Sequence, residues 1–268
     1  MRRITLADMS SGESVTGQAT ATSGSGDVVR SLELLWGLGE QPNRGPRRGL
    51  TLEQITTAAV AVADTEGLAA VSMRRLATDL GVGTMSLYRY VPGKAELLDL
   101  MLDHVQGLAM GPSGELPADW RDMVRALGRA ELEMYRARPW LLKVNQARTV
   151  LGPNALRSLE LALTGLKGMG MTDPETIGVI VAVHNYTVGA ARMELETTEA
   201  AQETGVSDEE FWQGQAPVLD RAMRSGEFPL LAALSEDAFG SSLDHFAFGL
   251  EALVTGFEAV VAARRGPA

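Results

Sequence analysis

The chain has 268 residues, with 24 Lys and Arg against 34 Asp and Glu, so its formal net charge is −10. It contains no cysteine, which excludes disulfide bonds, a cysteine nucleophile and thiolate metal sites. No apolar run reaches the roughly 18 residues that span a bilayer, and the N-terminus MRRITLADMS lacks the apolar core of a signal peptide, so we expect a cytoplasmic protein.

The charge is distributed unevenly along the chain. Residues 44–94 carry seven Lys and Arg against four Asp and Glu, whereas residues 101–268 carry 14 against 23. Attraction to nucleic-acid phosphates depends on the local charge of the contacting module rather than on the total. The pattern therefore indicates a mildly basic module followed by a strongly acidic one.

The first 48 residues form an N-terminal extension. Residues 1–27 are rich in Ser, Gly and Thr and bear few large apolar side chains, so we expect them to be disordered. The apolar spacing in residues 28–36 predicts a short amphipathic helix. The following segment, EQPNRGPRRG, predicts an extended basic linker that contains Arg44, Arg47 and Arg48.

A compact run of helices begins at Thr51, which forms a capping-box pattern with Gln54. This helix ends at Gly67, a second runs from Ser72 to Gly81, and a third lies within LGVGTMSLYRYVPGK at residues 80–94. A fourth helix is expected over residues 94–110. Two helices joined by a tight glycine turn, with the second one short and polar, are typical of a helix-turn-helix that binds the DNA major groove.

The rest of the chain reads as helical throughout, which predicts an all-α fold. We expect helices near residues 118–138, 140–148, 153–169, 174–204, 208–225 and 240–264, and find no alternating strand pattern. The three histidines show no metal-ligand spacing, and no nucleophile elbow, P-loop or dinucleotide fingerprint is present. We therefore expect no enzyme, no metal and no cofactor.

The short third helix carries the side chains that suit DNA. Thr84, Ser86 and Arg89 present donors for base edges and phosphates, and the rings of Tyr88 and Tyr90 can pack on sugars. The alternative is that both tyrosines are core residues and that Arg89 is a solvated charge. On so short and polar a helix, surface contact is the favoured reading.

Residues 51–107 resemble the DNA-binding domain of the TetR family of bacterial transcriptional repressors, chiefly through SMRRLATDLGVGTMSLYRYVPGKAELLD at 72–99. AVHNYTVGAARMELE at 182–196 and HFAFGLEALVTGFEAVV at 245–261 resemble two helices of the tetracycline-repressor branch that form a four-helix bundle with a second subunit. The resemblance implies a DNA-binding domain at 49–107 and an effector-binding and dimerisation domain at 108–268. It also implies a homodimer, although both helices could instead fill the core of one subunit.

The resemblance assigns DNA contacts to a set of polar and exposed residues in the basic module. They are Arg74, Thr84, Met85, Ser86, Tyr88, Arg89, Tyr90 and Lys94. Met85 and Arg89 stand where the tetracycline repressors carry proline and tryptophan, so the operator should differ. Arg44, Arg47 and Arg48 resemble basic arms that enter a minor groove, and a solvated linker is an equal alternative.

The acidic half implies an effector pocket of apolar walls with a few polar groups. The candidate residues are Met110, Leu127, Glu131, Met134, Trp140, Asn145, His184 and Trp212. Each could instead be a packing residue. The metal-binding side chains of the tetracycline repressors are not reproduced, so we expect a hydrophobic effector other than a magnesium–tetracycline complex.

The most consistent function is a ligand-responsive transcriptional regulator, a repressor that a small hydrophobic effector releases from a palindromic DNA operator. The alternative is a helical ligand-binding or interaction protein without operator binding. That protein would not need Arg74, Tyr88, Arg89 and Lys94 on one face.

Overall fold

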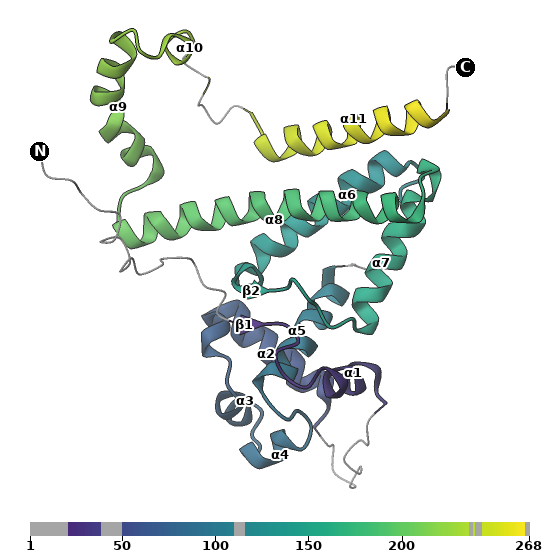
Figure 1. Ribbon diagram of the computed structural model, residues 1–268. Coiled ribbons are helices and arrows are strands. Elements are labelled where there is room, and N and C mark those ends of the chain that lie inside the picture. The colour runs from purple at the N-terminus through teal and green to yellow at the C-terminus, as the bar shows by residue number, and fades with distance from the viewer. Residues whose placement is uncertain (1–20, 39–49, 110–115, 236–237, 239–242, 266–268) are drawn as a thin grey trace, which may run out of the picture. The chain divides into compact units, whose positions relative to one another are not determined.

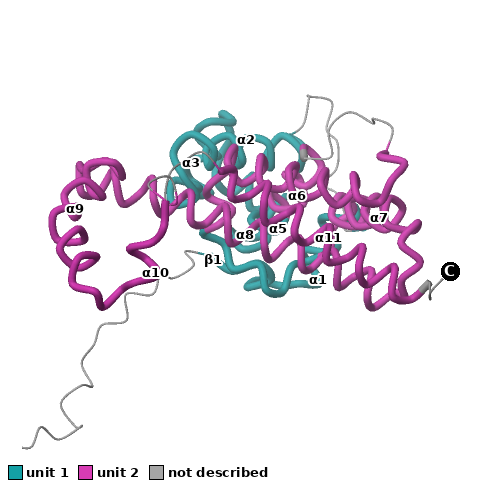
Figure 2. The backbone as a smooth tube through the Cα atoms, turned by 90° about the horizontal axis from the view of Figure 1, so that it is seen from above, with its two compact units in different colours: residues 1–99, 143–150 teal, residues 100–142, 151–268 magenta. Residues whose placement is uncertain are grey.

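The computed structural model describes residues 21–38, 50–109, 116–235, 238 and 243–265, and helices dominate these residues (Figure 1). The chain divides into two compact units (Figure 2). The first unit holds the residues up to Asp99 together with Lys143–Val150, and the second unit holds Leu100–Leu142 and the residues from Leu151 onward. The domain boundaries expected from the sequence, after residues 48 and 107, stay a prediction.

The first unit contains the predicted helix-turn-helix. Its helices are α1 (Val28–Trp36), α2 (Leu52–Glu66), α3 (Met73–Asp79) and α4 (Thr84–Tyr88), with a 3-10 turn at Leu68–Ala70 and the start of α5 (Lys94–Ala109). The predicted capping box is present, because the Gln54 amide donates to the Thr51 hydroxyl and the Thr51 amide donates to the Gln54 side chain. The side chains of this unit with no exposure include Ile55, Ala59, Leu76, Leu87, Val91 and Leu97.

Residues 21–27 are ordered, so the expectation of disorder was wrong for this part of the N-terminal extension; residues 1–20 lie outside the described residues. Strand β1 (Ala21–Thr22) pairs in parallel with β2 (Val144–Asn145). The Ser23 hydroxyl and the Gly24 amide both donate to Asp99 of α5. Composition alone could not reveal this order, because partners elsewhere in the chain supply it.

The second unit is a helical bundle built on α6 (Trp120–Ala137), α7 (Pro153–Leu166), α8 (Asp173–Thr204) and α11 (His245–Arg265). A 3-10 turn at Lys167–Met169 follows α7. Along the sequence, α9 (Asp208–Arg224) and α10 (Pro229–Ala232) come between α8 and α11. The buried cluster of this unit comprises Trp120, Met123, Val124, Leu166, Met169, Val179, Val183, Leu250, Val254 and Val261.

The helix expected over residues 140–148 is absent. A 3-10 turn occupies Pro139–Lys143, and β2 follows directly. The Asn145 carbonyl oxygen accepts from the Ser23 amide at 3.1 Å, and its side chain accepts from the Ala147 amide at 3.0 Å. Both acceptors are therefore used in strand and turn bonds rather than in a helical ladder.

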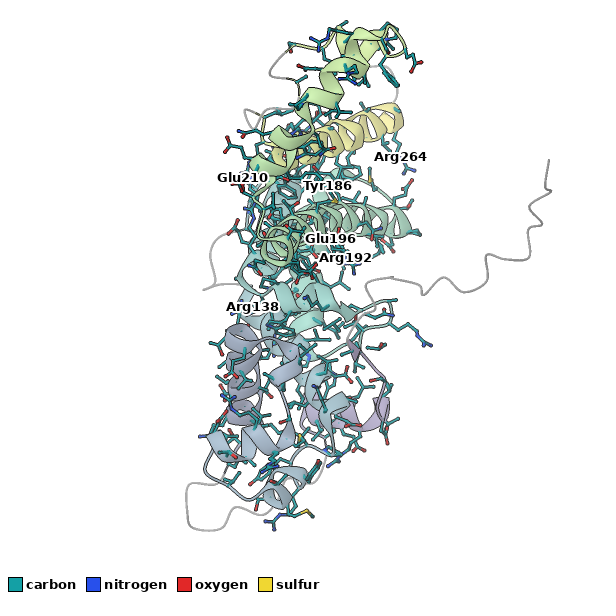
Figure 3. All side chains as sticks on the ribbon, turned by 90° about the vertical axis from the view of Figure 1, so that its left-hand side faces the viewer. Arg138, Tyr186, Arg192, Glu196, Glu210 and Arg264 are labelled. Atoms are coloured by element: carbon teal, nitrogen blue, oxygen red, sulfur yellow. The ribbon has the colours of Figure 1, made fainter. Side chains whose placement is uncertain are left out.

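Helix α11 packs on α8 and α6 within the second unit. The hydroxyl of Tyr186, labelled in Figure 3, donates to the carbonyl oxygens of His245 and Phe246, and its ring stacks on Phe246. By length and composition, α11 is the one helix of the described residues that could cross a membrane. Three of its residues, Leu250, Val254 and Val261, are buried in the core of the second unit.

Candidate nucleic-acid interface

The turn between α3 and α4 has the geometry of a helix-turn-helix. Gly81 adopts φ +66°, a left-handed conformation that glycine tolerates without a steric cost. The Val82 amide donates to the Ala77 carbonyl at 2.9 Å, which folds the chain back at the end of α3. Leu87 and Val91 are fully buried and fix α4 on the unit. These contacts leave the other side of α4 turned outward.

The outward side of α4 and its C-terminal residues form the α4 face, which consists of Thr84, Met85, Ser86, Tyr88, Arg89 and Tyr90. Met85 is 76% exposed and Tyr88 is 42% exposed, while Arg89 is also exposed. Thr84, Ser86 and Tyr90 are half-buried. Tyr88 is therefore a surface residue and not a core residue.

Arg89 is held along α4 by a neighbour of its own helical turn. Its Nη2 donates to the Ser86 hydroxyl oxygen at 3.1 Å. The bond uses one of the five guanidinium donors and leaves the remaining fork open. This bond restricts the Arg89 side chain in the unbound protein, so less conformational entropy is lost when Arg89 binds a ligand.

The two arginines at the start of α3 have different environments. Arg74 is exposed, and its guanidinium has no hydrogen bond with the described residues. Arg75 binds both carboxylate oxygens of Glu66 at 2.7 and 2.8 Å and also binds Asp79. The hydrogen bonds to Glu66 and Asp79 raise the pKa of Arg75, and the bond from Arg75 lowers the pKa of Glu66.

Arg75 is a residue that the sequence reasoning missed. It links the end of α2 to both ends of α3, so it supports the angle between these helices. The i,i+4 spacing of Arg75 and Asp79 was a visible signal of this role. Arg74 is consequently the arginine of the pair that remains available to a ligand.

The remaining basic candidates are Lys94 and the three arginines of the linker. Lys94 begins α5, and its ammonium donates to the Leu68 carbonyl at 3.4 Å. This bond leaves two ammonium protons for another acceptor. Arg44, Arg47 and Arg48 lie outside the described residues.

In the second unit, α6 and α8 bring together two of the predicted effector residues. The Nδ1 atom of His184 lies 2.6 Å from the Oε1 atom of Glu131. The Tyr135 hydroxyl donates to the same Glu131 oxygen at 3.4 Å. The hydrogen bond to Glu131 raises the pKa of His184, and burial is the main reason that the pKa of Tyr135 is also raised.

The other predicted effector residues differ in burial and in the unit to which they belong. Met134 and Trp140 are buried, and Leu127 packs against the core of the second unit. Trp212 is 56% exposed on α9, and Asn145 belongs to the first unit. Met110 lies outside the described residues, and those residues contain no group of His, Cys, Asp and Glu that could hold a metal ion.

Comparison with known proteins identifies the protein family to which the chain belongs. Residues 55–101 match the family described as bacterial regulatory proteins, tetR family, and residues 113–261 match the tetracyclin repressor-like C-terminal domain. The HTH-type transcriptional repressor DrrR1 of Streptomyces coeruleorubidus is 52% identical over 253 residues, which cover 94% of each chain. The chain belongs to the TetR family.

Solved structures of the TetR-family protein ActR from Streptomyces coelicolor share this fold. The apo structure has a TM-score of 0.58 and 27% identity, covering 83% of this chain and all of that one. The complex with actinorhodin has the same TM-score and 28% identity, covering 80% and 97%. The predicted all-α fold, with a helix-turn-helix domain before a larger helical domain, is therefore confirmed, and the chain is a TetR-family transcriptional regulator with repressor relatives.

Proposed function

We propose that this regulator is a cytoplasmic homodimeric repressor that binds a palindromic operator and is released by a small hydrophobic effector. The observation that carries the proposal is the α4 face, an exposed set of polar, aromatic and basic side chains on a helix whose other side is fully buried. A helix fixed in this way can enter a major groove without rearranging its own core.

The residues of the α4 face have separate roles in this proposal. Thr84, Met85 and Ser86 lie at the start of α4 and meet base edges, while Tyr88 and Tyr90 pack on sugar and reach phosphate. Arg89 reads a guanine, and Arg74 and Lys94 hold the backbone. Arg44, Arg47 and Arg48 supply the arm in the minor groove. The ordered Arg89 and the exposed Arg74 support this division.

The effector site is proposed for the second unit, between α6 and α8. Glu131 and His184 supply a polar pair, and the apolar Leu127 and Met134 belong to the same helix as Glu131. The other expected positions, Met110, Trp140 and Trp212, stay part of the proposal, whereas Asn145 belongs to the strand pairing of the first unit. That ActR is solved with actinorhodin supports a small-molecule effector of this half. Release follows if the effector binds a state in which the two recognition helices have the wrong spacing, because only differential affinity shifts the equilibrium.

The dimer is proposed to form through the outer sides of α8 and α11. Leu250 and Val254, which lie in the segment that resembles a dimerisation helix, are buried within one chain, and a side chain at Gly249 would collide with Tyr186 of the same chain. A second set of apolar side chains remains exposed on these helices: Ile177, Val181, Met193, Phe248 and Val260. Gly256 has open space around it, which allows another helix to approach.

The decisive experiment selects duplex DNA with the full-length protein from a random pool and titrates the winning duplex in rising salt. We expect a palindromic consensus and an affinity that falls linearly with the logarithm of salt concentration. Failure to enrich any sequence would overturn the repressor proposal in favour of a helical binding protein without an operator.

A further inference from the structure

The segment between α6 and α7 belongs to a different unit from the helices that it connects. Helices α6 and α7 are part of the second unit, whereas Lys143–Val150 is part of the first. The chain therefore enters the first unit at residue 143 and leaves it after residue 150. Any motion that changes the distance between the ends of α6 and α7 must act on this segment.

The segment is held in the first unit by the N-terminal extension. Ala21 and Thr22 pair with Val144 and Asn145, and the Ser23 amide donates to the Asn145 carbonyl at 3.1 Å. Gly24 packs beside Val150, whose side chain would lie 3.5 Å from a Cβ atom at that glycine. We call residues 21–38 the strap.

The strap is in turn held by buried carboxylates of α5. Asp99 is 1% exposed and accepts from the Ser23 hydroxyl at 2.9 Å, the Gly24 amide at 2.9 Å and the Ser31 hydroxyl at 2.7 Å. Glu96 is also buried and accepts from the Asp27 amide at 3.0 Å. Since a buried carboxylate is costly unless it is hydrogen-bonded, these donors make the strap an integral part of the unit.

One helical turn further along α5, Asp103 accepts hydrogen bonds from the start of α7 in the same way. This buried carboxylate accepts from the amides of Asn154 at 3.0 Å and Ala155 at 2.9 Å, at the start of α7. No side chain caps α7 from its own N-cap position, which is Gly152. Helix α5 thus carries the anchor of the strap and the anchor of α7 at positions i and i+4.

We propose that the strap couples the effector-binding unit to the DNA-binding unit, by keeping the α6–α7 segment paired with β1 on α5. A displacement of α6 or α7 then pulls on a segment that cannot move without breaking bonds to the strap. The buried face of α5 passes the displacement to the core of the first unit, where Leu97 and the α4 anchors Leu87 and Val91 are all fully buried. This inference rests on the proposed function, because it assigns a route for effector release.

Operator DNA can serve as the probe of this coupling, since a coupling free energy is reciprocal between two sites. Hydrogen–deuterium exchange is measured on the full-length protein with and without the duplex selected from the random pool. In the wild-type protein we expect the duplex to slow exchange in α3 and α4, and also in α6 and α7. In Ser31→Ala and Gly26→Ala, which loosen the strap, we expect slowing in α3 and α4 to remain and slowing in α6 and α7 to be lost.

Matched variants separate coupling from damage to the fold. A Cβ atom at Gly26 would lie 2.9 Å from the Ala95 Cβ atom and closer still to the Glu96 carboxylate, whereas a Cβ atom at Gly168 would meet nothing within 4 Å. Gly168→Ala should therefore behave as the wild type. Thr22→Cys with Asn145→Cys links the strap to the segment in a chain that has no other cysteine, and its oxidised form should keep the slowing of α6 and α7.

The outcomes are distinguishable from those of the proposed function. If no duplex is selected, the repressor proposal fails. If a duplex binds but leaves α6 and α7 unchanged in the wild type, or slows them equally in the strap variants, the coupling proposal is overturned while operator binding stands.

Discussion

The side chains of Glu131 and His184 join α6 to α8 through a single short contact of 2.6 Å between Oε1 and Nδ1. The carboxylate is mostly buried, at 21% side-chain exposure, while the imidazole is half exposed. The contact favours the imidazolium form, and it is the main cause of the raised pKa of His184. It therefore makes this one contact between the two helices depend on protonation.

His184→Gln tests this dependence. Because the pKa of His184 is raised in the folded chain above its ordinary 6.5, the contribution of the pair is fully present below 6.5 and is lost as the pH rises through the folded value. The difference in free energy of unfolding between wild type and variant should therefore be largest in mild acid and should shrink in alkaline buffer. Urea denaturation at several pH values measures it, with exposed His245→Gln as the control; a difference that does not vary with pH would contradict the assignment.

Arg89→Ala tests base reading by the α4 face. If the Arg89 guanidinium binds a guanine bidentately, its removal should cost about 1–3 kcal/mol at one operator position and relax the preference there. Arg74→Ala should instead weaken all duplexes alike and reduce the salt slope by about 0.9. Competition binding against single-base operator variants measures both effects. Arg157→Ala, which removes the same charge from α7, should change neither.

Ser31→Ala tests the energetic weight of the buried carboxylate in the first unit. Ser31 has no exposure, and its hydroxyl donates to Asp99 at 2.7 Å, so the variant leaves a buried acceptor with one donor fewer. We expect the free energy of unfolding to fall by about 1–3 kcal/mol. In a double-mutant cycle with Asp99→Asn, the two losses should be less than additive. Full additivity would show that the Ser31–Asp99 hydrogen bond makes no pairwise contribution to the free energy of unfolding.

Phe248→Asp tests the subunit interface. Phe248 is 63% exposed on α11, beside the core residues that hold this helix in its own chain. A charge at this position should leave the monomer fold intact and disfavour a dimer that buries it. Sedimentation should give the mass of one chain for the variant and of two chains for the wild type. Val29→Asp, on an equally exposed apolar residue of α1, should remain dimeric.

The order of helices could be predicted from the sequence because local signals mark it. Thr51 and Ser72 are capping residues, Gly81 takes the left-handed turn, and apolar spacing separates the faces of α2 and α3. The order in residues 21–27 could not be predicted in this way. It depends on Asp99 and Asn145, which are distant in sequence and carry no local pattern that pairs them with the N-terminal extension.

The candidate site residues likewise divide into those that local sequence patterns predict and those that depend on contacts between distant segments. The exposure of Tyr88 followed from the helix-turn-helix pattern, since buried Leu87 determines which way α4 faces, whereas Met85 was assigned to the same face by the family resemblance. The effector residues depend on which helices pack together, and that is a tertiary property. Glu131 and His184 were singled out individually, but their contact required α6 and α8 to be in place. Asn145 was assigned to the same group, and strand pairing assigns it to the first unit.

The pairing of β1 with β2 also sets an order of events during synthesis. Residues 21–22 leave the ribosome early, but their partners at 144–145 follow only after the whole of α6 has been made. A nascent chain thus contains every helix of the DNA-binding unit while that unit still lacks a strand. Chains truncated before residue 143 would carry an unfinished DNA-binding unit. The DNA-binding unit can therefore be completed only after α6 of the effector-binding unit has been synthesised.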